Sequence, residues 1–108
     1  MDKENNVSVS SGNVFADLGL PNPEDRRIKA QLARKISEII TNRKLTQVQA
    51  AEILGIDQPK VSLLIRGRLS GFSTDRLMGY LNNLGNDVEI IIKPKPENRK
   101  TAHTIVIC

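Results

Sequence analysis

The sequence predicts a mainly α fold of four to five helices, followed by a small C-terminal β-strand or hairpin addition. Between residues 23 and 85, apolar residues recur every three or four positions, which is the period of helices with one buried face. Residues that cap helices precede these stretches. After residue 87 the pattern changes to short runs of β-branched residues, which is typical of strands.

The first strong helix is predicted from Pro23 to about Asn42. Asn22 is its expected N-cap, Pro23 occupies the first helical position, and acidic residues follow in the first turn. One apolar stripe runs along it, made of Ile28, Leu32, Ile36, Ile39 and Ile40. Basic residues lie mostly off this stripe and could meet either phosphates or water: Arg26, Arg27, Lys29, Arg34 and Lys35.

Two short helices with a tight turn are predicted between residues 46 and 67. Thr46 and Gln49 have the spacing of a capping box at the start of the first one. Its apolar face holds Val48, Ala51 and Leu54. Gly55 ends it, because glycine adopts the left-handed conformation of a helix C-cap without steric cost.

The second short helix has Asp57 as its expected N-cap and Pro59 in its first turn. Its buried face should hold Val61, Leu64 and Ile65. The opposite face is mixed and cationic, and it contains Pro59, Ser62, Leu63 and Arg66, flanked by Gln58 and Lys60.

A helix pair of this kind is a helix-turn-helix, whose second helix enters the DNA major groove. The chain also resembles the phage-repressor-type (XRE) helix-turn-helix family. The resemblance rests on Thr46-Gln47, Ala50-Ala51, Leu54-Gly55-Ile56, Gln58, Val61-Ser62 and Gly67. An ordinary helical hairpin in an unrelated bundle is the alternative interpretation.

The rest of the chain completes three predicted regions, a flexible segment 1–22, a helix-turn-helix domain 23–85 and a β extension 86–108. Phe72, Ser73 and Leu77 have the spacing of a hydrophobic staple at the start of a last helix, which Gly85 ends. The predicted strands are 88–93 and 104–107. A lone hairpin is marginal in water, so these strands should pack on the helices or pair across a homodimer through Val88, Ile90 and Ile92.

Charge is unevenly distributed along the chain. Residues 1–25 carry a net charge of −4, residues 26–76 carry +7 and residues 77–108 carry +1. A basic helix-turn-helix segment is what a phosphate footprint requires, although solvated lysines and arginines would give the same count. Three aromatic residues are too few for a platform that stacks single-stranded bases.

Other classes of function find little support. The only histidine, His103, and the only cysteine, Cys108, have no spacing with carboxylates that suits a metal site or a catalytic nucleophile. We therefore expect no enzyme activity, no metal and no cofactor. A single cysteine suits a reducing compartment, and neither a signal peptide nor a membrane-spanning run is apparent, so a cytoplasmic location is expected.

The expected partner is double-stranded operator DNA. Gln58 should make a bidentate contact to adenine, Lys60 should reach a base or phosphate, and Pro59 with Leu63 should contact thymine methyl groups, with Ser62 beside them. The family resemblance implies that Gln47 faces the DNA backbone, where it should contact a phosphate and support the side chain of Gln58. The expected phosphate anchors are Arg43, Lys44, Arg66 and Arg68.

The whole chain also resembles the HigA-type antitoxins of bacterial toxin–antitoxin operons. The resemblance adds residues 15–20, Phe-Ala-Asp-Leu-Gly-Leu, and the segment 88–93 to the helix-turn-helix. It implies repression of the protein's own operon and neutralisation of a ribonuclease toxin, for which Phe15, Leu18 and Leu20 are the candidate anchors. The same three residues could instead cover the domain's own core. A repressor without a toxin and a protein-binding adaptor are the alternative functions.

Overall fold

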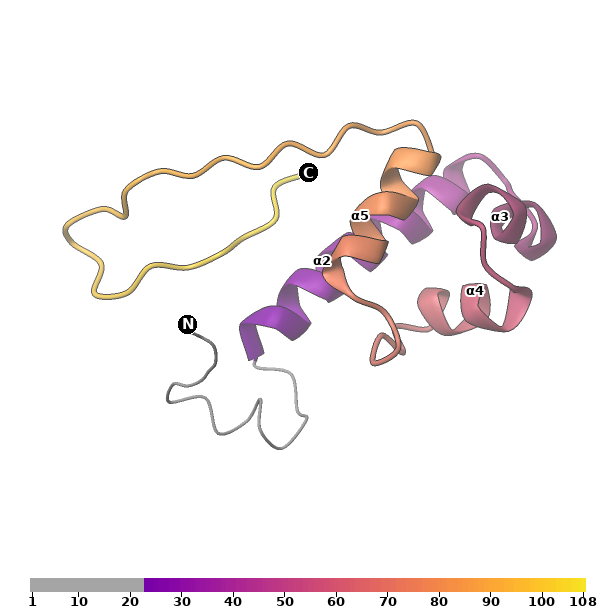
Figure 1. Ribbon diagram of the computed structural model, residues 1–108, viewed down its shortest axis with the longest axis horizontal. Coiled ribbons are helices and arrows are strands. Elements are labelled where there is room, and N and C mark those ends of the chain that lie inside the picture. Colours follow the sequence, from indigo (N-terminus) through magenta and orange to yellow (C-terminus); the bar gives the residue numbers. More distant parts are fainter. Residues whose placement is uncertain (1–22) are drawn as a thin grey trace, which may run out of the picture.

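The computed structural model describes residues 23–108. It contains helices α2 (Pro23–Asn42), α3 (Gln47–Leu54), α4 (Gln58–Ile65) and α5 (Thr74–Asn83), followed by an extended C-terminal segment (Figure 1). The predicted mainly α fold is therefore confirmed for these residues. The predicted N-cap Asn22, the flexible segment 1–22 and the anchors Phe15, Leu18 and Leu20 lie outside the described residues.

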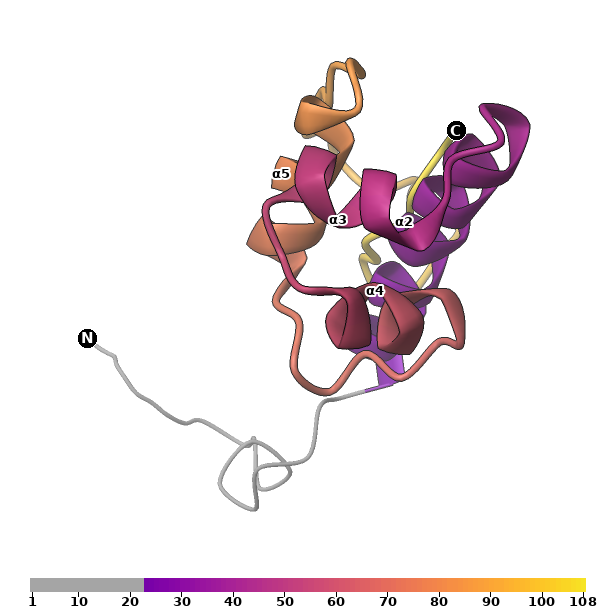
Figure 2. The ribbon, with the colours of Figure 1, turned by 90° about the vertical axis from the view of Figure 1, so that its right-hand side faces the viewer.

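The four helices are arranged so that the helix-turn-helix occupies one face. Helices α3 and α4 contact each other, α2 contacts α4 and α5, and α3 contacts α5. Figure 2 views this face directly and shows α3 and α4 in front of α2 and α5. Helices α2 and α5 therefore form the support on which α3 and α4 are held.

Local capping sets the ends of the short helices, as the sequence predicted. Thr46 Oγ1 accepts a hydrogen bond from Gln49 N at 3.1 Å, and Gln49 Oε1 accepts one from Thr46 N at 2.9 Å, which completes the capping box. Gly55 has a φ of 75° and donates its N–H to Ala51 O at 2.8 Å. Ser73 Oγ accepts from Arg76 N at 3.1 Å at the start of α5. Three helix ends are thus determined within four residues of sequence.

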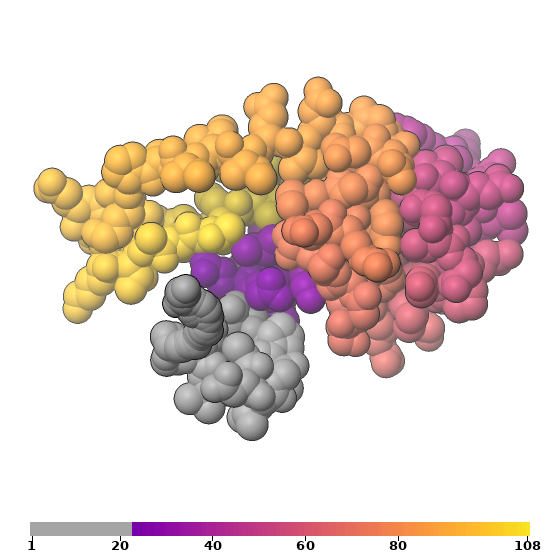
Figure 3. Space-filling view, in the orientation of Figure 1, coloured from indigo at the N-terminus to yellow at the C-terminus, as the bar shows by residue number. Residues whose placement is uncertain are grey.

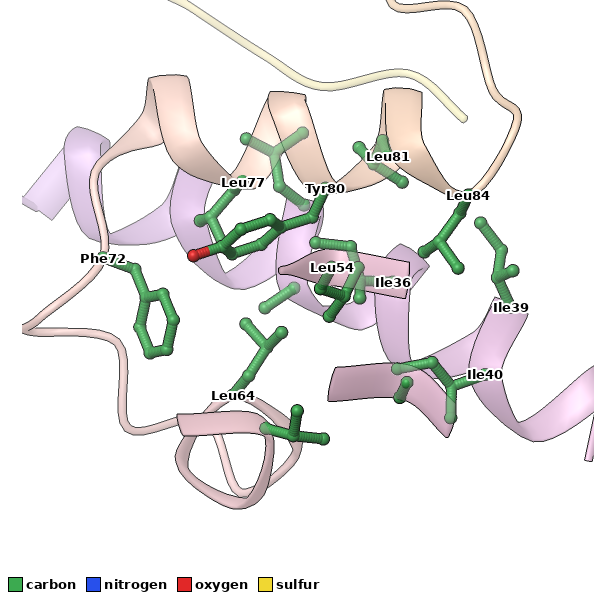
Figure 4. Packing of buried hydrophobic residues seen from close by; sticks show 14 of the residues in the cluster. Ile36, Ile39, Ile40, Leu54, Leu64, Phe72, Leu77, Tyr80, Leu81 and Leu84 are labelled. Atoms are coloured by element: carbon green, nitrogen blue, oxygen red, sulfur yellow. The ribbon is translucent and has the colours of Figure 1, made fainter. Parts of the chain in front are cut away.

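The core lies between the four helices (Figure 4). Ile36 of α2, Leu64 of α4 and Leu77 of α5 are almost completely buried. Phe72, just before α5, packs edge-on against Tyr80 with ring centroids 6.1 Å apart. Phe72 and Leu77 are both buried, as the staple prediction requires. Since every helix contributes to this cluster, the position of α4 depends on the other three.

Two expected core positions are exposed. Val48 is 50% exposed, and α3 instead packs through Ala50, Ala51 and Leu54. Ile65 is 42% exposed, because only Val61 and Leu64 of the predicted α4 stripe face the core. The reason is geometric: an eight-residue helix between two neighbours buries a narrower stripe than its apolar pattern offers.

The predicted C-terminal strands are wrong for the described residues. Segments 88–93 and 104–107 are extended but form no β-ladder, and the backbone hydrogen bond within residues 87–108 joins Arg99 N to Pro96 O at the turn. Figures 1 and 3 show this segment leaving the helical body after α5 and doubling back. Pro94 and Pro96 have no N–H to donate, and β-branched residues form a strand only when a partner strand is present.

The returning half of the C-terminal segment is attached to the start of α2. Thr104 N donates to Glu24 Oε2 at 2.6 Å, and Val106 packs against the helical core. Val88 packs there as well, directly after α5. No helix of the described residues is long and apolar enough to cross a membrane.

Candidate nucleic-acid interface

The outward face of α4 is the centre of the candidate site. Gln58, Pro59 and Lys60 are exposed in the first turn, and Leu63 is 37% exposed one turn later. Ser62 is half-buried between them. The opposite face is locked into the core by Val61 and Leu64, so the rotation of α4 about its axis is fixed by packing. The structure thus brings the five predicted base-contacting residues onto one helix.

The start of α4 is held by its own cap. Asp57 Oδ1 accepts a hydrogen bond from Lys60 N at 3.0 Å, which satisfies one of the free amides of the first turn. Three residues separate α3 from α4, and the left-handed Gly55 makes this turn possible. The position of Gln58 at the tip of α4 is therefore set by the turn, by the Asp57 cap and by the packing of α4, and not by a contact of its own side chain.

The polar side chains of this face are available to a ligand. In residues 23–108, the side chains of Gln58, Lys60 and Gln47 have no hydrogen-bond or ion-pair partner. Gln49, by contrast, is used by the capping box. Exposed amides without internal partners are suited to bidentate bonds with a base or to bonds with a phosphate.

The predicted phosphate anchors fall into two groups. Lys44, Arg66 and Arg68 are exposed at the ends of the two short helices. Lys44 lies before α3 with a φ of 56°, and Arg66 follows α4 with its Nε 3.4 Å from Ser62 O. Along the chain, Arg66 and Arg68 follow α4, whereas Lys44 precedes α3.

Arg43 has an internal partner that the sequence did not indicate. Its Nη2 donates to Leu84 O at 2.5 Å, at the carboxyl end of α5. A guanidinium here satisfies a carbonyl that the helix leaves without an intrahelical donor and interacts favourably with the helix dipole. The phosphate contact of Arg43 stays a prediction, and the structure assigns this residue a capping contact.

Two residues that the sequence reasoning did not select share this surface. Val48 and Arg76 line a shallow groove together with Gln58 and Lys60, between α3, α4 and the first turn of α5. The sequence did place Arg76 in the first turn of a helix, three residues after the N-cap Ser73, and the structure shows it exposed there. Nothing in the sequence indicated that the start of α5 would line the same groove as the start of α4, because this depends on the packing of the helices.

The dimensions of α4 suit a groove of duplex DNA. An α-helix with its side chains is about 10–12 Å across, and the major groove of B-DNA is about 12 Å wide, so a helix such as α4 can enter it. The described residues hold no group of three or more histidine, cysteine, aspartate or glutamate side chains that could bind a metal ion. His103 lies in the C-terminal segment, where a ring nitrogen is 2.6 Å from Arg99 Nη1.

The predicted dimer residues are divided by the structure. Val88 is half-buried against the helical core, whereas Ile90 and Ile92 are 74% and 92% exposed. Ile91 between them is 79% exposed. The apolar segment is therefore present and accessible, although it is not a strand within one chain.

The fold and the exposed face of α4 define a helix-turn-helix protein. A model of a helix-turn-helix domain family matches residues 14–93. A solved structure described as "Putative XRE Family Transcriptional Regulator" is 45% identical; the match covers 82% of this chain and 99% of that chain, with a TM-score of 0.79. No curated protein matches the sequence. The chain belongs to the XRE-type helix-turn-helix family.

Proposed function

We propose that this protein is a transcriptional repressor that recognises a specific sequence in duplex DNA. The observation that carries the proposal is the first turn of α4, where Gln58 and Lys60 are exposed and lack partners in the described residues. The buried Val61 and Leu64 hold that turn outward. The name of the similar structure, a transcriptional regulator, supports the same function.

Reading of the sequence would take place through the edges of bases in the major groove. The side-chain amide of Gln58 can donate a hydrogen bond to N7 of adenine and accept one from its exocyclic N6 amine, which is a bidentate pairing. Lys60 supplies donors for a guanine edge or a phosphate, and the apolar atoms of Pro59 and Leu63 fit thymine methyl groups. Ser62 can donate or accept beside them.

Affinity would come mainly from phosphate contacts that flank α4. Gln47 opens α3 with a side-chain amide that has no partner within residues 23–108, and Lys44, Arg66 and Arg68 add charge at the ends of the two helices. Arg76 joins them at the start of α5. Residues 26–76 carry a net charge of +7, which favours association with a polyanion and makes binding dependent on salt.

Two copies are needed for a unique genomic site. One eight-residue helix can contact only a few base pairs, so we propose a homodimer that binds two half-sites roughly one helical turn apart. Repression then follows from occupation of a promoter that contains such a site.

The test is a comparison of Gln58→Ala with a matched amide variant. A preferred sequence is first selected from a random duplex pool with the full chain, and affinities for this duplex and a scrambled one are then measured. Gln58→Ala should lose about 1–3 kcal/mol on the selected duplex and little on the scrambled one. Asn83→Ala removes an exposed amide at the end of α5 and should leave both affinities unchanged.

Two results would overturn the proposal. Equal losses on both duplexes would mean that Gln58 does not read bases. Failure of the full chain to enrich any sequence would favour the protein-binding adaptor instead.

We further propose that the repressor is an antitoxin. The segregation of charge supports this, with −4 in residues 1–25 and +7 in residues 26–76, as expected when two ends of a chain serve two partners. A ribonuclease must hold RNA phosphates, so an acidic apolar segment with Phe15, Leu18 and Leu20 suits its basic active site. Co-expression with the neighbouring reading frame tests this: that frame alone should arrest growth, and this protein should restore it. A harmless neighbour would favour a repressor without a toxin.

A further inference from the structure

The most unusual exposed surface of the described residues is the extended run Glu89–Lys93. Its three central isoleucines, Ile90, Ile91 and Ile92, are 74%, 79% and 92% exposed. The backbone N–H and C=O groups of this run make no hydrogen bonds within residues 23–108. An extended backbone without partners that carries adjacent isoleucines is a template for pairing with another strand.

We propose that Glu89–Lys93 pairs with the same run of a second copy of this chain, antiparallel and with Ile91 opposite Ile91. The proposal rests on the homodimer of the proposed function and specifies its interface, and the pairing itself needs no DNA. It identifies the partner, the orientation and the register of the interface.

Charge complementarity selects the partner and the register. With Ile91 opposite its own copy, Glu89 lies opposite Lys93 of the second chain, and this pair occurs twice by symmetry. Ile90 then lies opposite Ile92, so no apolar side chain faces a charge. The two neighbouring symmetric registers are centred on Ile90 and on Ile92. They place Ile91 opposite Glu89 and opposite Lys93, respectively. A parallel, in-register pair would place like charges opposite each other, which is unfavourable.

Pro94 is compatible with this register. If the two copies of Ile91 form a hydrogen-bonded pair, the N–H groups of Glu89, Ile91 and Lys93 all point to the partner strand. Pro94 then falls at a position whose nitrogen points away from the partner, where its missing N–H costs nothing. The ladder therefore ends at Pro94 without an unsatisfied carbonyl opposite it.

Pairing would also cover the apolar side chains. Alternation along a strand places Ile90 and Ile92 on one face, next to the same two residues of the second chain. Val88 lies on the same face, and it already packs against the helical core of its own chain. The joined isoleucine strip is thus continuous with a half-buried residue that packs against the core, which favours burial of the strip between the two helical bodies.

The test is a reciprocal charge exchange in the full-length chain, measured by sedimentation velocity across a concentration series. Glu89→Lys alone places lysine opposite lysine, and Lys93→Glu alone places glutamate opposite glutamate. Each variant should dimerise at least ~10-fold more weakly than the unaltered chain, because two attractive pairs become repulsive. An equimolar mixture should restore dimers, since both pairs are complementary in the heterodimer.

Matched controls separate register from net charge. Glu97→Lys and Lys95→Glu change the charge identically but lie beyond the paired run, so each should dimerise like the unaltered chain. Circular dichroism should show the same helix content for all variants. The proposal is overturned if the single variants dimerise normally, if the mixture stays monomeric, or if the control variants lose as much affinity. A chain that is monomeric throughout, with 88–93 paired to its own 104–107, would also overturn it.

Discussion

Arg43 has two alternative roles that can be told apart by experiment. In the structure it caps α5 through Leu84 O, whereas the sequence predicted that it contacts a DNA phosphate. Arg43→Ala removes the donor that lies 2.5 Å from Leu84 O at the end of α5. A hydrogen bond to a charged group contributes about 1.5–3 kcal/mol, and the exposure of Arg43 together with the nearby Asn86 Nδ2, at 3.4 Å, reduces this to roughly 1–2 kcal/mol. For a domain of this size, the melting temperature should fall by about 5–15 °C.

Lys44→Ala is the matched control, because Lys44 is the next residue, is exposed and has no side-chain partner in residues 23–108. Thermal unfolding and DNA binding at several salt concentrations would be measured for both variants. We expect Lys44→Ala to melt normally and to reduce the slope of log affinity against log salt by about one. Arg43→Ala should melt at a lower temperature and leave this slope unchanged. An Arg43→Ala protein that melts normally but loses the salt-dependent contact would refute the capping assignment.

Two further predictions concern the turn and the N-terminal segment. Gly55→Ala should destabilise the domain by about 1–2 kcal/mol in urea unfolding, because Gly55 has a φ of 75°, which alanine adopts only at a cost. Gly79→Ala should instead stabilise the domain by about 0.5–1 kcal/mol in the same assay. Gly79 lies inside α5, where alanine is the better helix former and an added Cβ meets no atom within 4 Å. Equal changes in the free energy of unfolding for the two variants would contradict the argument that only Gly55 needs glycine for its backbone conformation. Deletion of residues 1–20 should weaken toxin neutralisation in the co-expression assay while leaving DNA affinity and melting temperature nearly intact. A truncated protein that melts well below the full chain and still neutralises the toxin would show that Phe15, Leu18 and Leu20 serve the domain's own core.

The helix ends and the residues on the outward face of α4 could be predicted from the sequence. Thr46 with Gln49, Asp57 and Ser73 all cap as expected, and Gly55 ends α3 as expected. These interactions join atoms within four residues of one another, so neighbouring sequence is enough to specify them. The exposure of Gln58 and Lys60 follows from the helical period once α4 begins at residue 58.

Contacts between distant segments could not be predicted in this way. Val48 and Ile65 belong to apolar patterns but are exposed, because the neighbouring helices cover only part of each short helix. The contact of Arg43 with Leu84 spans 41 residues, and the groove that joins Arg76 to Gln58 requires the packing of α5 against α3.

The C-terminal segment shows the same distinction most clearly. The sequence alone determines that 88–93 is rich in β-branched residues, because this property belongs to the residues themselves. Whether it is a strand depends on a second backbone to accept and donate hydrogen bonds, and residues 23–108 of one chain supply no such partner. Helix-forming hydrogen bonds close within five residues, whereas those of a sheet join separate segments, and only the tertiary structure decides whether these segments meet.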